Sequence, residues 1–181
     1  MNLYWRLLLL RFRLLTAPRV NIWDTVRTPF RVVPTDLDLL LHMNNGKYLT
    51  LMDLGRMDLM LRSRMWGEMT KRGWYPVVAG QTITYRRSLN PFQRFDLLTK
   101  VLGVDDRWIY MDQTFVVGET VHAHAVIRAR FLKKGGGSVE HDEIEEVIGT
   151  FPDHLELPEW LVDWTESTKI PTAAPDVSRA V

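Results

Sequence analysis

Hydrophobic and polar residues alternate from Thr120 to Phe131, a period typical of a β-strand with one buried face. The apolar face holds Val121, Ala123, Ala125, Ile127, Ala129 and Phe131. The polar face holds His122, His124, Arg128 and Arg130. Because the apolar face is built largely from small residues, we expect a helix to approach this strand closely.

Four further segments have the β-branched and aromatic content of strands. They cover residues 30–33, 75–87, 95–104 and 108–117. Pro34 ends the first, because proline cannot donate to a strand ladder. Turn residues separate the others, and Gly118-Glu119 is typical of a two-residue hairpin. The second half of the chain therefore predicts four antiparallel strands.

Residues 45–67 lack proline and are dominated by Leu, Met and Arg, which predicts one long helix, with Gly67 and later Gly73 as stop signals. Its apolar residues occupy much of the circumference, which indicates a helix surrounded by other structure. One strand, one long helix and four strands predict an α+β fold, in which a long central helix is wrapped by a curved antiparallel sheet of about five strands.

We divide the chain into an N-terminal apolar arm (1–27), a central domain (28–134) and a C-terminal extension and tail (135–181). Two short helices are expected in the extension, at 139–148 and 158–164. From residue 170 onward, proline and small residues predict a frayed tail.

The first fifteen residues are apolar and contain arginines. Arg11 and Arg13 interrupt the apolar run, which falls far short of the roughly 20 residues of a membrane-spanning helix. The interpretation we favour is an apolar arm docked on the domain or on a second subunit. The alternative is peripheral membrane contact through residues 1–15.

Composition narrows the choice of function. The chain has 181 residues, which fits one domain, and its formal net charge of +1 gives no reason to expect a nucleic-acid partner. The absence of cysteine excludes disulfides, thiolate metal sites and cysteine nucleophiles. A cytoplasmic location is the default expectation.

The segment just before the long helix concentrates polar chemistry. It reads D-x-D-x-x-x-H-x-N-N-x-x-Y and contains Asp36, Asp38, His42, Asn44, Asn45 and Tyr48. This spacing resembles the signature of the 4-hydroxybenzoyl-CoA thioesterase-like branch of the hot-dog superfamily. Further matches are Asp53 and Arg56 in the helix and the segments 85–91 and 95–96. One departure is Leu41, where the family often has glycine.

The resemblance implies a hot-dog fold and hydrolysis of an acyl-CoA or acyl-carrier-protein thioester. It implies that Asp38 acts on the thioester, by activating water or by direct attack, and that the Asn45 backbone N–H at the helix start polarises the carbonyl. His42 completes the catalytic set, and we favour an orienting hydrogen bond for it over proton transfer. The expected substrate-binding residues are Asn44, Tyr48, Arg86 and Arg87.

Several of these residues have structural alternatives. Asp38 is also placed to cap a turn or the helix, and Asn44 and Asn45 most simply cap the helix. Asp36 is expected to cap, or to pair with Arg31 or Arg56, and Asp53 is expected to pair with Arg56. Lys133 and Lys134 are further candidates for the coenzyme A phosphates. His122 and His124 lack a third metal ligand, so no metal site is expected.

We expect no cofactor, coenzyme A being part of the substrate. The resemblance places the active site between two subunits, which implies a homodimer or homotetramer. The main alternative function is an acyl-CoA or fatty-acid binding protein without catalysis, and a hydratase or dehydratase ranks after it.

Overall fold

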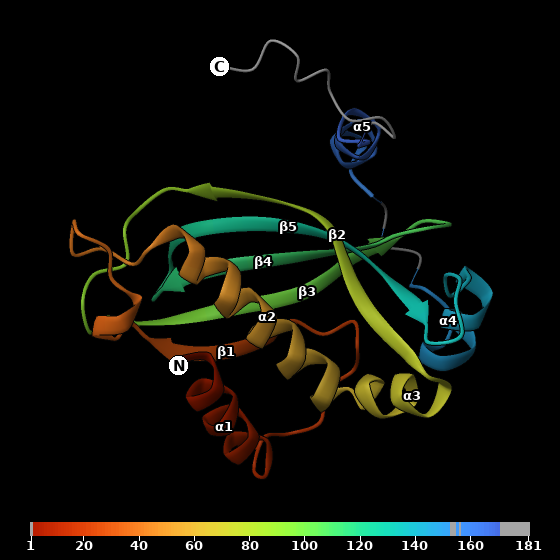
Figure 1. The fold of residues 1–181 in the computed structure, drawn as a ribbon, viewed down its shortest axis with the longest axis horizontal. Helices are drawn as coiled ribbons and strands as arrows, with labels where there is room; N and C mark the ends of the chain where they lie inside the picture. The colour runs from red at the N-terminus through yellow and green to blue at the C-terminus, as the bar shows by residue number, and fades with distance from the viewer. Residues whose placement is uncertain (1, 153–154, 156, 171–181) are drawn as a thin grey trace, which may run out of the picture.

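The computed structural model describes residues 2–152, 155 and 157–170, and it contains one five-stranded antiparallel sheet (Figure 1). The strand order is β1-β3-β4-β5-β2. The strands are β1 (Val26–Arg31), β2 (Trp74–Tyr85), β3 (Arg94–Val104), β4 (Ile109–Val117) and β5 (Thr120–Lys133). The α+β architecture is confirmed, and β2 to β5 lie within two residues of their predicted bounds. The first strand begins four residues earlier than predicted.

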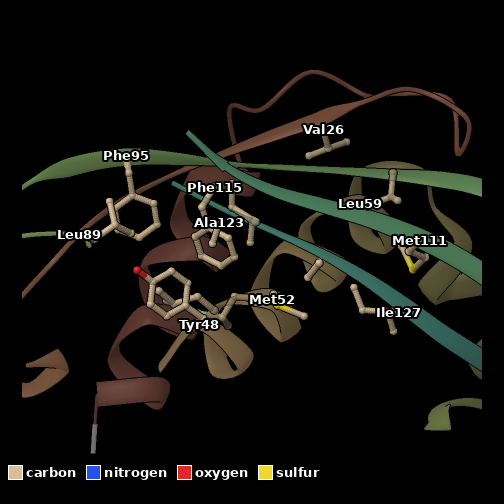
Figure 2. Close-up of a cluster of buried hydrophobic side chains, with 14 of the residues drawn as sticks. Val26, Tyr48, Met52, Leu59, Leu89, Phe95, Met111, Phe115, Ala123 and Ile127 are labelled. Carbon is tan, nitrogen blue, oxygen red and sulfur yellow. The ribbon is translucent and has the colours of Figure 1, made fainter. Parts of the chain in front are cut away.

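The helix α2 (Asn45–Arg62) packs on one face of the sheet. In Figure 2 the rings of Tyr48, Phe95 and Phe115 meet beside Leu89, and Met52 faces the same core. The small residues of β5 lie in this core, as their spacing predicted. At Gly55 an added Cβ would lie 2.7 Å from Leu97 Cδ2 and 2.8 Å from Thr99 Oγ1, so only glycine allows this approach.

The predicted long helix is wrong in its last part, because the chain forms two helices there. After α2, Arg64 adopts a left-handed conformation (φ 66°) and α3 (Met65–Arg72) begins. Gly67 lies inside α3, and the stop occurs at Gly73, whose φ of 68° is readily accessible to glycine. The left-handed turn redirects α3 toward β2.

The N-terminal residues form a helix, α1 (Asn2–Leu14), that packs against α2. Leu10 is buried in the contact. Arg6 pairs with Asp36, and Arg13 pairs with Asp58 at 3.1 Å. The favoured interpretation, an apolar arm docked on the domain, agrees with this packing. Across the described residues no helix is long and apolar enough to cross a membrane. Membrane contact through residues 1–15 stays a prediction.

Two helices follow the sheet, α4 (His141–Ile148) and α5 (Glu159–Ser167), as the sequence predicted. α5 covers the face of the sheet opposite α2 (Figure 1), where Leu161 packs with Tyr110 and Val126. Arg128 lies between Trp108 and Trp164, 5.0 Å from each ring centroid. α5 therefore covers this face at Val126 and Arg128, while His124 on the same face stays exposed. The predicted frayed tail lies outside the described residues, apart from Ile170.

Candidate active site

The loop before α2 is closed by its own hydrogen bonds. It follows a short 3₁₀ helix, η1 (Pro34–Asp36). The Asp38 N–H donates to the His42 carbonyl at 2.9 Å, and the Asn44 N–H donates to the Asp36 carbonyl at 2.8 Å. These bonds hold the main chain at Asp38 and the helix start in a fixed position relative to each other.

The Asp38 carboxylate is half-buried and uses one oxygen to hold the loop. Its Oδ1 accepts the Leu40 N–H at 2.9 Å and the His42 N–H at 3.3 Å. Its Oδ2 has no hydrogen-bond partner within the described part of the chain. The turn-capping role predicted as an alternative is therefore present, and it leaves the second oxygen available.

Asn44 caps α2, with its side chain accepting the Gly46 N–H at 2.9 Å. Asn45 is the first residue of the helix, where N–H groups have no intrahelical acceptor. No acceptor for the Asn45 N–H is found among the described residues. This N–H and the positive end of the helix dipole form a site for a partial negative charge.

Leu41 lies in the left-handed region with a φ of 59°. A side chain other than that of glycine is strained in this conformation, typically by about 1–2 kcal/mol. Position 41 therefore has a backbone conformation that glycine adopts readily. Leu39, Leu40 and Leu41 are 100%, 75% and 64% exposed at the tip.

A cavity of about 320 Å³ brings most of the predicted site together. Its lining residues are Asp38, Leu40, His42, Met43, Asn45, Tyr48, Tyr85, Arg86, Arg87 and Ser88. Asn44 is the one predicted site residue that does not line it, because its side chain is turned to the helix cap. The cavity connects the Asp38 carboxylate with the start of α2.

His42 acts in the loop through its main chain. Both its N–H and its carbonyl bond to Asp38, while its exposed ring lines the cavity. The predicted orienting hydrogen bond from the ring is not found among the described residues.

Tyr85 is a lining residue that the sequence analysis did not nominate. Its ring centroid lies 5.0 Å from that of Tyr48, edge to face, and its hydroxyl reaches the Asn45 carbonyl at 3.5 Å. Burial raises the pKa of both phenols, so each stays protonated at neutral pH. The available signal in the sequence was the place of Tyr85 near the end of the predicted strand 75–87, directly before Arg86.

Arg86 and Arg87 are exposed at the mouth of the cavity, and both N–H groups donate to the His122 carbonyl. Lys133 and Lys134 are no longer candidates for binding the coenzyme A phosphates. Lys133 pairs with Glu143 at 2.7 Å and lies opposite Trp74 at the far end of β5. Ten residues of strand, roughly 33 Å, separate it from Ala123.

The remaining acidic and histidine candidates have partners of their own and do not line the cavity at Asp38. Asp36 pairs with Arg6, so its expected pairing with Arg31 or Arg56 is wrong. Its expected capping is present, because Asp36 Oδ2 accepts the Val33 N–H at the start of η1 at 3.0 Å. Arg56 pairs with Asp53, as predicted.

His124 Nε2 lies 2.6 Å from Asp112 Oδ2. His122 Nδ1 lies 3.1 Å from the Ser88 carbonyl oxygen. The two rings therefore have separate partners, although they share one face of β5.

Comparison with known proteins identifies the family. Residues 32–173, well over half of the chain, match the family described as the Thioesterase-like superfamily. The chain belongs to this superfamily. Protein THEM6 of Xenopus laevis is 34% identical over 145 residues, covering 74% of this chain and 63% of that protein. The chain thus spans less than two thirds of that relative's length.

Solved structures place the fold in the hot-dog class, as predicted. The YbaW probable thioesterase of Escherichia coli superposes with a TM-score of 0.64 at 22% identity, covering 68% of this chain and 96% of that one. The BH1999 gentisyl-coenzyme A thioesterase gives a TM-score of 0.60 at 14% identity, covering 67% of this chain and 100% of that one.

Proposed function

We propose that the protein hydrolyses an acyl-CoA thioester, with Asp38 as general base or nucleophile. The observation that carries the proposal is the cavity shared by the Asp38 carboxylate and the first turn of α2. The carboxylate supplies a base or nucleophile, and the helix start supplies a donor for the oxygen that becomes negative in the transition state.

Three further features support an acyl-CoA substrate. The chain belongs to a thioesterase-like superfamily, and one protein of similar fold is a gentisyl-coenzyme A thioesterase. Arg86 and Arg87 flank the mouth, where they are placed to meet phosphates. Tyr48 and Tyr85 keep their protons and offer hydroxyl donors or ring surface to the acyl group.

A homodimer is the smallest unit we expect. Strand β2 ends the sheet and has no neighbour on its outer side within the described chain. Tyr75, Val78 and Tyr85 on this strand are each 41% exposed. A second copy would cover this edge and lie next to the cavity through Tyr85. Light scattering on the purified chain measures the state, and a monomer would contradict the expectation.

One observation favours the second candidate, an acyl-CoA binding protein without turnover. Asp38 Oδ1 is already engaged by two main-chain N–H groups, as in a purely structural cap. An assay of acetyl-, benzoyl-, octanoyl- and palmitoyl-CoA hydrolysis separates the two candidates. A thiol reagent detects the coenzyme A that is released. The protein itself contributes no thiol signal, because it contains no cysteine. Tight binding without release of coenzyme A selects the binding protein.

The proposed role of the Asn45 N–H has its own test. Asn45→Pro removes that N–H at a position where helices accept proline. Loss of one such donor is expected to lower kcat by roughly 10²–10³. Asn45→Ala is the matched control, because it keeps the N–H and loses only an exposed side chain. Equal rates for the two variants would remove the N–H from the mechanism.

A further inference from the structure

A second cavity, of about 410 Å³, lies around the C-terminal half of α2. Its volume is within the range of roughly 300–1,000 Å³ seen for ligand sites. It shares no lining residue with the cavity at Asp38. Its walls come from α1, α2, α3, α4, the segment 22–23 and strands of the sheet. A cavity lined by so many separate elements suits a chain-like ligand better than it suits the flat surface of another protein.

The lining is almost wholly apolar. Leu7 from α1, Met57 from α2, Trp66 from α3 and Ile144 from α4 contribute to it. Such a surface recognises hydrocarbon and offers little to a charged headgroup.

The charged residues of the lining are already partnered. Asp53 and Arg56 form an ion pair, and Arg56 Nη1 donates to Gln113 Oε1 at 2.7 Å. The Arg130 guanidinium lies over the Trp108 ring and donates to the Ser138 hydroxyl. The cavity therefore favours an uncharged aliphatic chain whose polar end lies elsewhere.

The two cavities lie along the same two elements. On α2, Asn45, Leu49, Asp53 and Met57 are spaced four residues apart, so they follow one face of the helix. Asn45 borders the first cavity, and Asp53 and Met57 border the second. Eight residues of helix place Asp53 about 12 Å beyond Asn45. Strand β2 gives the same order, with Tyr85 at the first cavity and Val78 at the second.

We propose that this second cavity holds the far end of a long aliphatic acyl chain whose thioester lies between Asp38 and Asn45. This inference rests on the proposed thioesterase function and names its substrate class as long-chain fatty acyl-CoA. An acetyl or benzoyl group at Asn45 is too short to reach Asp53. The arm and the α4 extension thus contribute to chain-length selection through Leu7 and Ile144.

Chain-length kinetics test the inference. The value of kcat/KM is expected to rise about fourfold for each methylene that enters the cavity, and then to level off. Met57→Trp and Met60→Trp fill the cavity from two half-buried positions of α2. Each is expected to lower kcat/KM for palmitoyl-CoA at least tenfold and to leave acetyl-CoA within twofold. Val162→Trp, on the exposed side of α5, is the matched control. A length-independent effect, or none in both variants, overturns the inference.

A binding assay separates this inference from the proposed function. Displacement of a fluorescent long-chain fatty acid by palmitate reports the cavity without any turnover. Binding that both Trp variants weaken, in a protein that hydrolyses no acyl-CoA, would support the cavity and refute the thioesterase proposal. Hydrolysis with no binding of the probe would support the thioesterase proposal and refute the role of the cavity. Palmitate should inhibit palmitoyl-CoA hydrolysis competitively, and non-competitive inhibition would contradict a shared acyl site.

Discussion

The ion pair between Arg6 and Asp36 ties the N-terminal helix to the candidate site. Only 8% of the Arg6 side chain and 2% of the Asp36 side chain are exposed. Asp36 Oδ2 also accepts the Val33 N–H at 3.0 Å, and the Asp36 carbonyl accepts the N–H of Asn44, the cap of α2. Removing the arginine would leave a buried carboxylate beside the helix start.

Arg6→Met keeps an unbranched apolar side chain and removes the guanidinium charge. Breaking one partner of a buried pair typically costs about 3–5 kcal/mol. At about 2–4 °C per kcal/mol for a chain of this size, we expect Tm to fall by roughly 6–20 °C. Burial lowers the pKa of Arg6, although arginine still carries its charge at neutral pH.

Thermal unfolding followed by circular dichroism at pH 7 measures this effect. Arg11→Met is the matched control, because Arg11 is exposed on the same helix. Combining Arg6→Met with Asp36→Asn completes a double-mutant cycle and should recover part of the loss. A Tm for Arg6→Met within about 2 °C of the Arg11→Met value would refute the claim that the pair stabilises the fold.

Three further predictions follow from local geometry. Gly55→Ala should destabilise the fold by about 1–3 kcal/mol in urea, because the new Cβ would lie within 2.9 Å of three side-chain atoms; a more stable variant would contradict this. Leu41→Gly should change stability by less than about 1 kcal/mol, because relief of left-handed strain offsets the added freedom of the unfolded chain. Leu41→Ile should be clearly less stable, and equal Tm values would argue against strain. Burial raises the pKa of Tyr110 to about 12, so the unfolded state ionises first and stability should fall between pH 10 and 12 by at most about 1.4 kcal/mol per pH unit. Tyr110→Phe should show a shallower fall in urea titrations, and an identical slope would contradict the assignment.

The strands were predictable because successive side chains of a strand point to opposite faces of the sheet. A strand with one buried face therefore alternates apolar and polar residues. On β5 the alternation separated the core face from the face under α5. The end of α2 was not predictable in the same way. The break occurs at Arg64, which has neither the freedom of glycine nor the constraint of proline, and its left-handed conformation accompanies the packing of α3 on β2.

The candidate site was predictable where its residues are adjacent in sequence. Asp38, His42 and Asn45 belong to one loop and the helix that follows it, so their spacing fixes their proximity. Tyr85 comes from a strand forty residues away in sequence and reaches Asn45 only through the folded sheet. The pairings of Arg6 with Asp36 and of Arg13 with Asp58 are similarly remote, since many carboxylates were available to each arginine.

The central claim is that the free oxygen of Asp38 performs the hydrolytic step, and Asp38→Asn tests it most directly. The amide oxygen can still accept the Leu40 and His42 N–H groups, so the loop should keep its fold and Tm should change by less than about 2 °C. We predict that kcat for the best acyl-CoA substrate falls by roughly 10²–10⁴, the usual contribution of a general acid or base. A folded Asp38→Asn protein that hydrolyses the substrate within twofold of the wild-type rate would contradict the account.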